Sequence, residues 1–103
     1  MDNYITDFGI FEWDDKKERK NIRKHGISFK LALHVFKDPN YIVLYDSEHS
    51  ELEDREIAVG VVGKIDNLVS VVYTERHGNT TRIISAQEAK PELRRIYNEY
   101  NNM

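Results

Sequence analysis

The sequence has no cysteine, so disulfide bonds and thiolate metal sites are excluded. It contains only five glycines and two prolines among 103 residues, and no repeat, low-complexity tract or flexible linker interrupts it. Its apolar runs reach only four or five residues, far short of a membrane crossing. The first residues lack the basic start and apolar stretch of a secretion signal. We therefore expect a single cytoplasmic domain, residues 1–103, with no membrane segment.

Positive charge is also scarce overall, since the net charge is −3 and the pI is near 5.8. This balance argues against a protein that coats nucleic acid through bulk charge. The charges are nevertheless segregated. Seven basic and three acidic residues lie between Asp14 and Lys30, whereas six acidic residues and one arginine lie between Asp46 and Glu56. Two interpretations fit this pattern: a basic face for a ligand, or charges that are solvated or paired within the fold.

The first half of the chain predicts two helices. Phe11–Trp13 is typical of a short strand or an extended lead-in, and Asp14 or Asp15 can cap a helix that ends near His25. Gly26 then suits the left-handed residue that follows a helix. A second helix is expected after the cap Ser28 and before Asp38-Pro39-Asn40, because one apolar stripe has helical spacing: Phe29, Ala32, Leu33 and Phe36.

The second half predicts four strands from short β-branched segments, namely Tyr41–Tyr45, Arg55–Val62, Leu68–Thr74 and Thr81–Ser85. Connections of hairpin length at residues 63–67 and 77–79 make the last three an antiparallel meander. Ser85-Ala86-Gln87-Glu88 has the pattern of a capping box, while Pro91 favours a helix that begins there. The predicted fold is α+β: two N-terminal helices, a four-stranded antiparallel sheet and a C-terminal helix in a two-layer sandwich. Residues 1–10 are expected to form an N-terminal extension, and residues 11–97 the domain itself.

Three arginines form the first candidate site. Arg76 and Arg82 should lie near the same hairpin end, and Arg55 begins a neighbouring strand. Guanidinium groups this close repel one another unless an anion lies among them. A phosphate is one such anion, and nearby carboxylates in salt bridges are the more common alternative: Glu53, Asp54, Glu56 and Glu75.

Lys24 and His25 form the second candidate site. The C-terminal end of a helix favours a protonated imidazole, which suits proton transfer or contact with phosphate. A structural role is the usual one for a lone histidine, and His34, His49 and His77 have still less to mark them. The sequence has no zinc-ligand spacing, glycine-rich phosphate loop or nucleophile elbow. No cofactor and no metal are expected.

Taken together, these segments resemble the BrnT family of type II toxins. The similar segments run from Phe11 to Tyr97 in the order Phe11-Glu12-Trp13-Asp14, Asn21, Lys24-His25-Gly26-Ile27-Ser28-Phe29, Val35-Phe36, Asp38-Pro39, Glu53-Asp54-Arg55, Gly60, Val71-Val72-Tyr73-Thr74-Glu75-Arg76 and Arg82-Ile83-Ile84-Ser85-Ala86. The resemblance implies a RelE-like fold and an RNA-cleaving activity that arrests translation. It also implies a BrnA-type antitoxin partner and contact with operator DNA only through the toxin–antitoxin complex.

The resemblance assigns catalytic roles to Lys24, His25, Glu53, Arg55, Arg76 and Arg82. RNA supplies its own nucleophile, the 2′-hydroxyl, so a metal-independent scheme can be written. In it Glu53 or His25 is the base, the arginines and Lys24 stabilise the phosphorane, and His25 or water protonates the leaving oxygen. One position departs from the family pattern, because Gln87 stands where an arginine is usual. The alternative function is therefore a weakened toxin-fold binding module that acts with an antitoxin as co-repressor.

Overall fold

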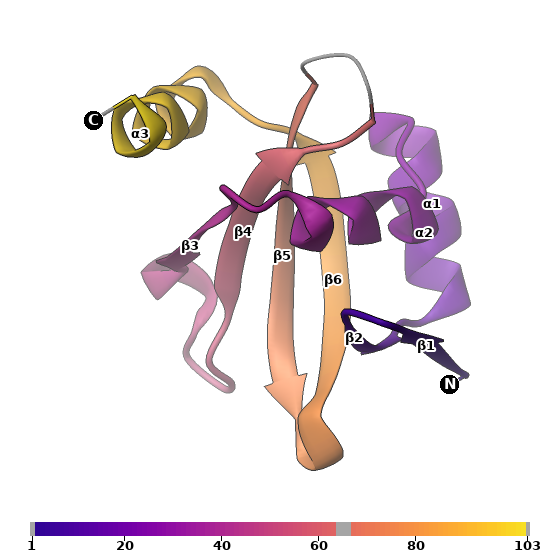
Figure 1. The fold of residues 1–103 in the computed structure, drawn as a ribbon. Coiled ribbons are helices and arrows are strands. Elements are labelled where there is room, and N and C mark those ends of the chain that lie inside the picture. Colours follow the sequence, from indigo (N-terminus) through magenta and orange to yellow (C-terminus); the bar gives the residue numbers. More distant parts are fainter. Residues whose placement is uncertain (1, 64–66, 103) are drawn as a thin grey trace.

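The computed structural model describes residues 2–63 and 67–102 (Figure 1). A short hairpin comes first, followed by three helical segments, four strands and a final helix. The elements in chain order are β1 (Asn3–Thr6), β2 (Gly9–Glu12), α1 (Asp15–His25), α2 (Phe29–Ala32), the 3₁₀ helix η1 (Leu33–Lys37), β3 (Ile42–Tyr45), η2 (Ser47–His49), β4 (Glu56–Val61), β5 (Leu68–Arg76), η3 (His77–Asn79), β6 (Thr80–Glu88) and α3 (Pro91–Asn101).

The described strands form one six-stranded mixed sheet in the order β1-β2-β6-β5-β4-β3. The four predicted strands are present as β3 to β6, and each is antiparallel to the next. The predicted four-stranded antiparallel sheet is nevertheless wrong, because the β1–β2 hairpin extends it and β2 runs parallel to β6, with Glu12 opposite Arg82. Part of the predicted connection at residues 63–67 lies outside the described residues.

The helix boundaries follow the capping residues. The Asp14 carboxylate accepts from the Lys16 amide at 2.8 Å, and Gly26 ends α1 with a φ of 72°. Ser28 caps α2 by accepting from the Leu31 amide. The continuous second helix predicted to Phe36 is wrong, because the chain tightens into η1 after one turn.

The expected capping box at Ser85 is also wrong. Residues 85–88 remain in β6, where β5 pairs with their backbone, and α3 begins at Pro91 instead. A proline at the first helical position has no amide to leave unpaired, which explains this start.

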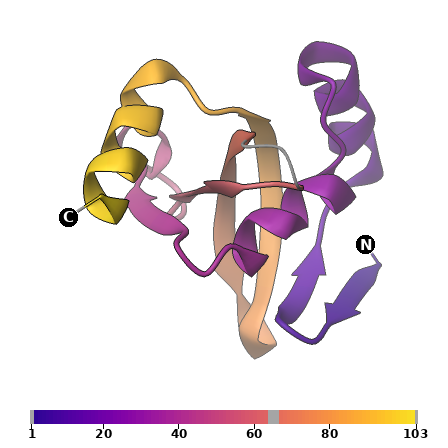
Figure 2. The same ribbon diagram turned by 45° about the horizontal axis from the view of Figure 1, so that its top comes forward.

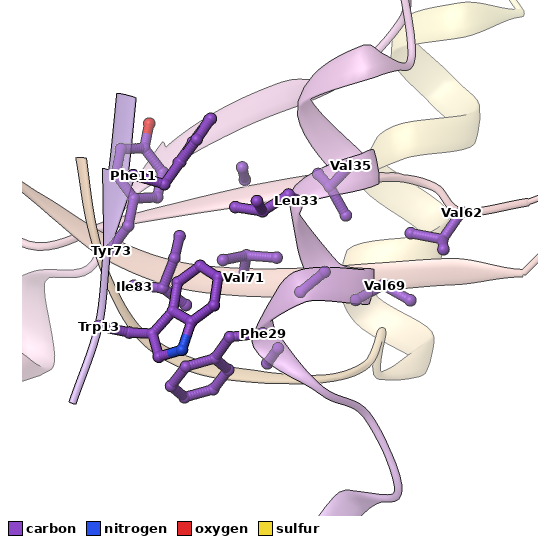
Figure 3. Packing of buried hydrophobic residues seen from close by; sticks show 13 residues of the cluster. Phe11, Trp13, Phe29, Leu33, Val35, Val62, Val69, Val71, Tyr73 and Ile83 are labelled. Carbon is purple, nitrogen blue, oxygen red and sulfur yellow. The ribbon is translucent and has the colours of Figure 1, made fainter. Parts of the chain in front are cut away.

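The main core lies between one sheet face and the α2–η1 segment (Figure 3). Trp13 packs edge-on against Phe29, which is fully buried. On the same face η1 approaches β4 so closely that a Cβ at Gly60 would lie 2.9 Å from the Val35 carbonyl oxygen. Glycine is therefore needed there for packing, and the apolar side chains of this face anchor α2 and η1 to the sheet.

A second, smaller core lies on the opposite sheet face, where α3 covers β3 and β4. It contains Val59, Leu68, Ala89 and Tyr97. The helices thus cover both faces of the sheet and do not form the single layer predicted; Figure 2 shows α1 and α3 at opposite sides of it. Because α3 reaches only one end of its face, the rest of that face stays open.

Asn21 joins α1 to the edge of β6. Its side-chain amide donates to the Ala86 carbonyl at 2.8 Å and its oxygen accepts from the Ala86 amide at 3.1 Å, as a neighbouring strand would. The same amide nitrogen also donates to the Ile27 carbonyl. Because β2 pairs with β6 only as far as Arg82, this buried side chain satisfies an edge that no strand reaches.

Replacing Asn21 by Ala should lower the free energy of unfolding by roughly 2–4 kcal/mol, because both backbone groups of Ala86 lose their partner in a buried site. Urea unfolding followed by circular dichroism measures the change. Asn98→Ala on the exposed side of α3 is the matched control and should shift stability by less than about 0.5 kcal/mol. Equal losses in the two variants would show that Asn21 has no special structural role.

Asp38 anchors α3 to the sheet. Its Oδ2 accepts from the Tyr97 hydroxyl at 2.6 Å and from the Val61 amide at 2.8 Å, and its Oδ1 accepts from the Asn40 amide. Burial by itself raises the pKa of Asp38, but these hydrogen bonds outweigh burial and hold the pKa below its ordinary value of 3.8.

At pH 7 Tyr97→Phe should lower the free energy of unfolding by about 1–3 kcal/mol, since a hydrogen bond to a carboxylate is lost. A depressed pKa in the folded state means that this contribution is complete above about pH 4 and is lost as pH falls through the folded value. The difference between wild type and variant should therefore narrow at pH 3, as urea unfolding at both pH values would show. Tyr100→Phe, at an exposed position, is the control. An unchanged difference would exclude Asp38 as the partner that matters.

Candidate functional site

The segment of residues 46–55, called here the 46–55 loop, forms one wall of the open sheet face. The Asp46 amide donates to the Arg55 carbonyl at 2.9 Å and closes its ends. The Ser50 hydroxyl donates to the Asp46 carbonyl at 2.6 Å and accepts from the Arg55 amide at 3.0 Å. This loop therefore has a defined shape despite its exposure, and it holds its charged side chains in fixed relative positions.

Glu53 lies between two of the predicted arginines. Its Oε1 is 3.5 Å from Nη2 of Arg55, and its Oε2 is 3.6 Å from Nη1 of Arg76. All three side chains are between 29% and 40% exposed. The Thr74 hydroxyl donates to the Asp54 carbonyl at 2.7 Å and fixes the loop to β5 beside them. Sequence reasoning placed these groups together, and the fold does bring them together.

Arg82 occupies the same sheet face one strand further on. Thr74 of β5 pairs with Arg82 of β6. On the other side of β5, Glu56 pairs with Tyr73, so Arg55, the residue before Glu56, lies beside Thr74. Arg55, Thr74 and Arg82 therefore form a row across three strands, with the two arginines about 10 Å apart at their Cα atoms. Arg82 is also paired with Glu12, since its Nε donates to Oε2 at 2.6 Å.

A hollow of about 680 Å³ adjoins this row, between the 46–55 loop and α3. Its floor includes Val72, Ile84 and Ser85. Ile84 and Ser85 lie side by side because the β5–β6 register shifts between Val72 and Tyr73, and this bulge interrupts the alternation of side chains along β6. Further lining comes from Leu44, Tyr45, Asp46, Ser47, Glu48, His49, Arg55, Ile57, Gln87, Lys90, Glu92, Leu93 and Ile96.

Lys24 and His25 are not part of this arrangement. They lie in the last turn of α1, which follows the β6 edge away from the η3 hairpin (Figure 1). Asn21, one turn earlier in α1, already contacts Ala86, which is about 13 Å beyond Arg82 along the strand. Neither Lys24 nor His25 lines the hollow. The fold thus brings four of the six predicted residues onto one face and leaves these two elsewhere.

A family model described as "Ribonuclease toxin, BrnT, of type II toxin-antitoxin system" matches residues 13–92. The chain belongs to the BrnT family. A crystal structure of the Brucella abortus ribonuclease toxin BrnT has a similar fold, with a TM-score of 0.56 and 22% sequence identity over 78% of this chain and 95% of that one. No curated protein matches the sequence. Membership in a toxin family of this type implies an antitoxin partner and an RNA substrate in general terms.

Gln87 is the position at which the resemblance to the family leads us to expect an arginine. It belongs to β6, pairs with Ser70 and lines the hollow together with Arg55 and Lys90. An arginine at position 87 would therefore lie on the same sheet face as Arg55 and Arg82.

Among the described helices, none is long and apolar enough to span a membrane.

Sequence reasoning missed a histidine–carboxylate pair in this BrnT chain. Nδ1 of His49 lies 3.2 and 3.1 Å from the two carboxylate oxygens of Asp46. The spacing of three residues between Asp46 and His49 was the only signal in the sequence, and it was not distinctive within a run of acidic residues.

Tyr73, by contrast, is unsuited to proton transfer. Burial, with Glu56, Glu75 and Tyr41 adding to it, raises the pKa of Tyr73 well above its ordinary value.

Proposed function

We propose that this chain is a metal-independent endoribonuclease that inhibits translation by cleaving RNA and is neutralised by a BrnA-type antitoxin. Arg55, Arg76 and Arg82 would bind the scissile phosphodiester on the open sheet face. The observation that carries the proposal is the position of Glu53 between Arg55 and Arg76, because it identifies a place where two guanidinium groups already hold an anion.

The two pairs made by Glu53 are weak enough to be exchanged. Their distances of 3.5 and 3.6 Å are long, and exposed pairs of this kind contribute about 0–1 kcal/mol each. Arg55 also keeps a buried Nε without a hydrogen-bond partner among the described residues. A phosphate can therefore replace the carboxylate at small cost and gain bidentate contacts from both arginines.

Arg82 is held in a stronger ion pair than Arg55 and Arg76. Its contact with Glu12 is short, and the Glu12 side chain is only 14% exposed, so this pair is held more firmly. It ties β2 to β6, which gives Arg82 a structural role in addition to any contact with RNA. We accordingly assign the main phosphate contacts to Arg55 and Arg76, with Arg82 supporting them from the next strand.

Such a site needs little from the protein beyond charge and position. The 2′-hydroxyl of RNA attacks the adjacent phosphorus, and guanidinium groups stabilise the negative charge that builds up on the phosphorane oxygens. Glu53, held between two arginines, acts here as their counter-ion. Lys24 and His25 stay outside this chemistry because α1 keeps them away from the row.

Arg55→Ala and Arg76→Ala should each lower kcat/KM for a short RNA by about 10²–10³-fold, the usual effect of removing one donor to a transition-state oxyanion. Arg95→Ala is the control, because Arg95 is exposed on α3 and pairs only with Glu99 among the described residues. Fluorescent RNA cleavage with the purified chain, with and without ribosomes, measures the rates.

Two further conditions test the reaction type. Excess EDTA should leave the rate unchanged, and a single 2′-deoxy substitution at the cleaved nucleotide should abolish cleavage. Wild-type rates in both variants would remove Arg55 and Arg76 from the reaction. Cleavage of the 2′-deoxy substrate would exclude attack by the 2′-hydroxyl.

Gln87 favours a second candidate function, a weakened toxin that binds its antitoxin and represses transcription with it. Gln87→Arg should increase kcat/KM by about 10-fold or more if the charge is what the site lacks. Gln87→Lys tests charge without the planar fork, and Gln87→Met tests size alone. An inactive wild type with an active Gln87→Arg variant would establish the weakened toxin, whereas no change in any variant would show that position 87 is unimportant.

A further inference from the structure

We infer that His49, oriented by Asp46, is the general base that removes the proton from the 2′-hydroxyl. This inference rests on the proposed function and adds the group which that function leaves unassigned. Three features of the 46–55 loop support this role: the burial of Asp46, the direction of the second imidazole nitrogen of His49, and the residues that surround the imidazole.

Asp46 is a nearly buried carboxylate with one partner. Its side chain is 10% exposed, whereas that of His49 is 62% exposed. Among the described residues only Nδ1 of His49 reaches the carboxylate, at 3.1 and 3.2 Å from its oxygens. Burying a carboxylate costs free energy, and an ion pair with an exposed histidine contributes little stability in return. Stability alone therefore does not explain why Asp46 is buried beside His49.

The contact determines the tautomer of His49. A carboxylate next to Nδ1 requires the proton on that nitrogen, which leaves the lone pair on Nε2 at the other side of the ring. This is the arrangement by which a carboxylate prepares a histidine to act as a base. The backbone of Asp46 is itself fixed by Arg55 and Ser50, so the imidazole is attached to a rigid support.

His49 borders the arginine row. It lines the hollow over β5 and β6, and it also lines a neighbouring hollow formed by Glu48, His49, Glu51, Leu52, Glu53 and Arg55. Arg55 is shared by both hollows. A phosphate that replaces Glu53 beside Arg55 therefore brings its neighbouring ribose to the side of the loop that carries His49. The charged residues that line one or both of these hollows together with His49 are Asp46, Glu48, Glu51, Glu53, Arg55, Lys90 and Glu92.

The step balances without a co-reactant other than water. Nε2 of His49 takes the proton of the 2′-hydroxyl while the 2′-oxygen forms a bond to phosphorus. The bond from phosphorus to the 5′-oxygen of the next nucleotide breaks, and that oxygen takes a proton from water. The hydroxide left behind takes the proton held on Nε2, which restores the water and returns His49 to its starting form. The products are a 2′,3′-cyclic phosphate and a free 5′-hydroxyl, and no electron transfer is involved.

The main test compares His49→Gln with His34→Gln on the same short RNA. His34 is an exposed histidine of η1 on the other side of the sheet, which makes it a matched control. His49→Gln should lower kcat by about 10²–10⁴-fold, as expected for loss of a general base, with KM changed by less than about threefold. His34→Gln should behave as wild type.

Asp46 is a positioning residue and needs a readout that a structural role would not change. Asp46→Asn should lower kcat without changing KM, and ¹⁵N NMR of the imidazole should show the proton moving from Nδ1 to Nε2. Added imidazole should restore cleavage by His49→Ala, because the free base can enter an exposed position, and should not restore cleavage by Arg55→Ala.

The outcomes separate the two proposals. If wild type cleaves RNA and His49→Gln keeps kcat within about threefold of it, the role of His49 is overturned and the proposed function stands. If His49→Gln is inactive but imidazole fails to rescue His49→Ala and the Asp46→Asn tautomer is unchanged, the pair is structural and the inference is also overturned. A wild type that leaves RNA intact with and without ribosomes overturns both.

Discussion

Two hydrogen bonds between the Asn21 side chain and the Ala86 backbone determine how the sheet ends. The hairpin strand β2 is too short to accompany β6 over its whole length, so without Asn21 the last residues of β6 would have an unpaired edge. Pairing with β5 keeps β6 extended as far as Glu88, while the Asn21 side chain satisfies the other edge of β6 at Ala86 and fixes α1 beside it. Ser85 and Gln87 are in register with β5 and line the hollow, and the chain enters α3 from the end of the sheet.

The open face follows from this arrangement. Since α3 begins beyond β6 and packs on Val59 and Leu68, it covers one end of the face and leaves the other end to the 46–55 loop. Asp38 holds Tyr97 of α3 in place, while Thr74 holds the loop by its Asp54 carbonyl. The hollow thus has two walls, each tied to the sheet by a specific hydrogen bond, and the arginine row lies where the second wall meets β5.

Local signals predicted much of this fold. Asp14, Gly26 and Ser28 mark helix ends through bonds to residues two to four positions away, and the four predicted strands were recognisable from their own residues. The N-terminal hairpin was not, because its place depends on pairing between Glu12 and Arg82, which are far apart in sequence.

The residues of the candidate site also divide into those whose positions local sequence signals predicted and those whose positions depend on distant contacts. Arg55 and Arg76 could be placed together with Glu53 because strand register brings neighbouring strand ends to one edge. The positions of Lys24 and His25 at the end of α1 could not be predicted, because they depend on the hydrogen bond between Asn21 and Ala86, which are far apart in the sequence. The pair of Asp46 and His49 was hidden for a related reason: their short spacing has meaning only once the loop closes through Ser50.

The acidic loop and the arginine row make sense together if a single phosphodiester is held. Glu48, Glu51 and Glu92 border the hollows, and Glu53 lies between Arg55 and Arg76. In the proposed mechanism the first three would repel phosphates further along an RNA strand, and a phosphate would replace Glu53. Repulsion around one attractive point favours the position of the cleaved bond over general affinity for nucleic acid. A net charge of −3 is therefore compatible with the proposed RNA cleavage, which would need positive charge only where the phosphorane forms.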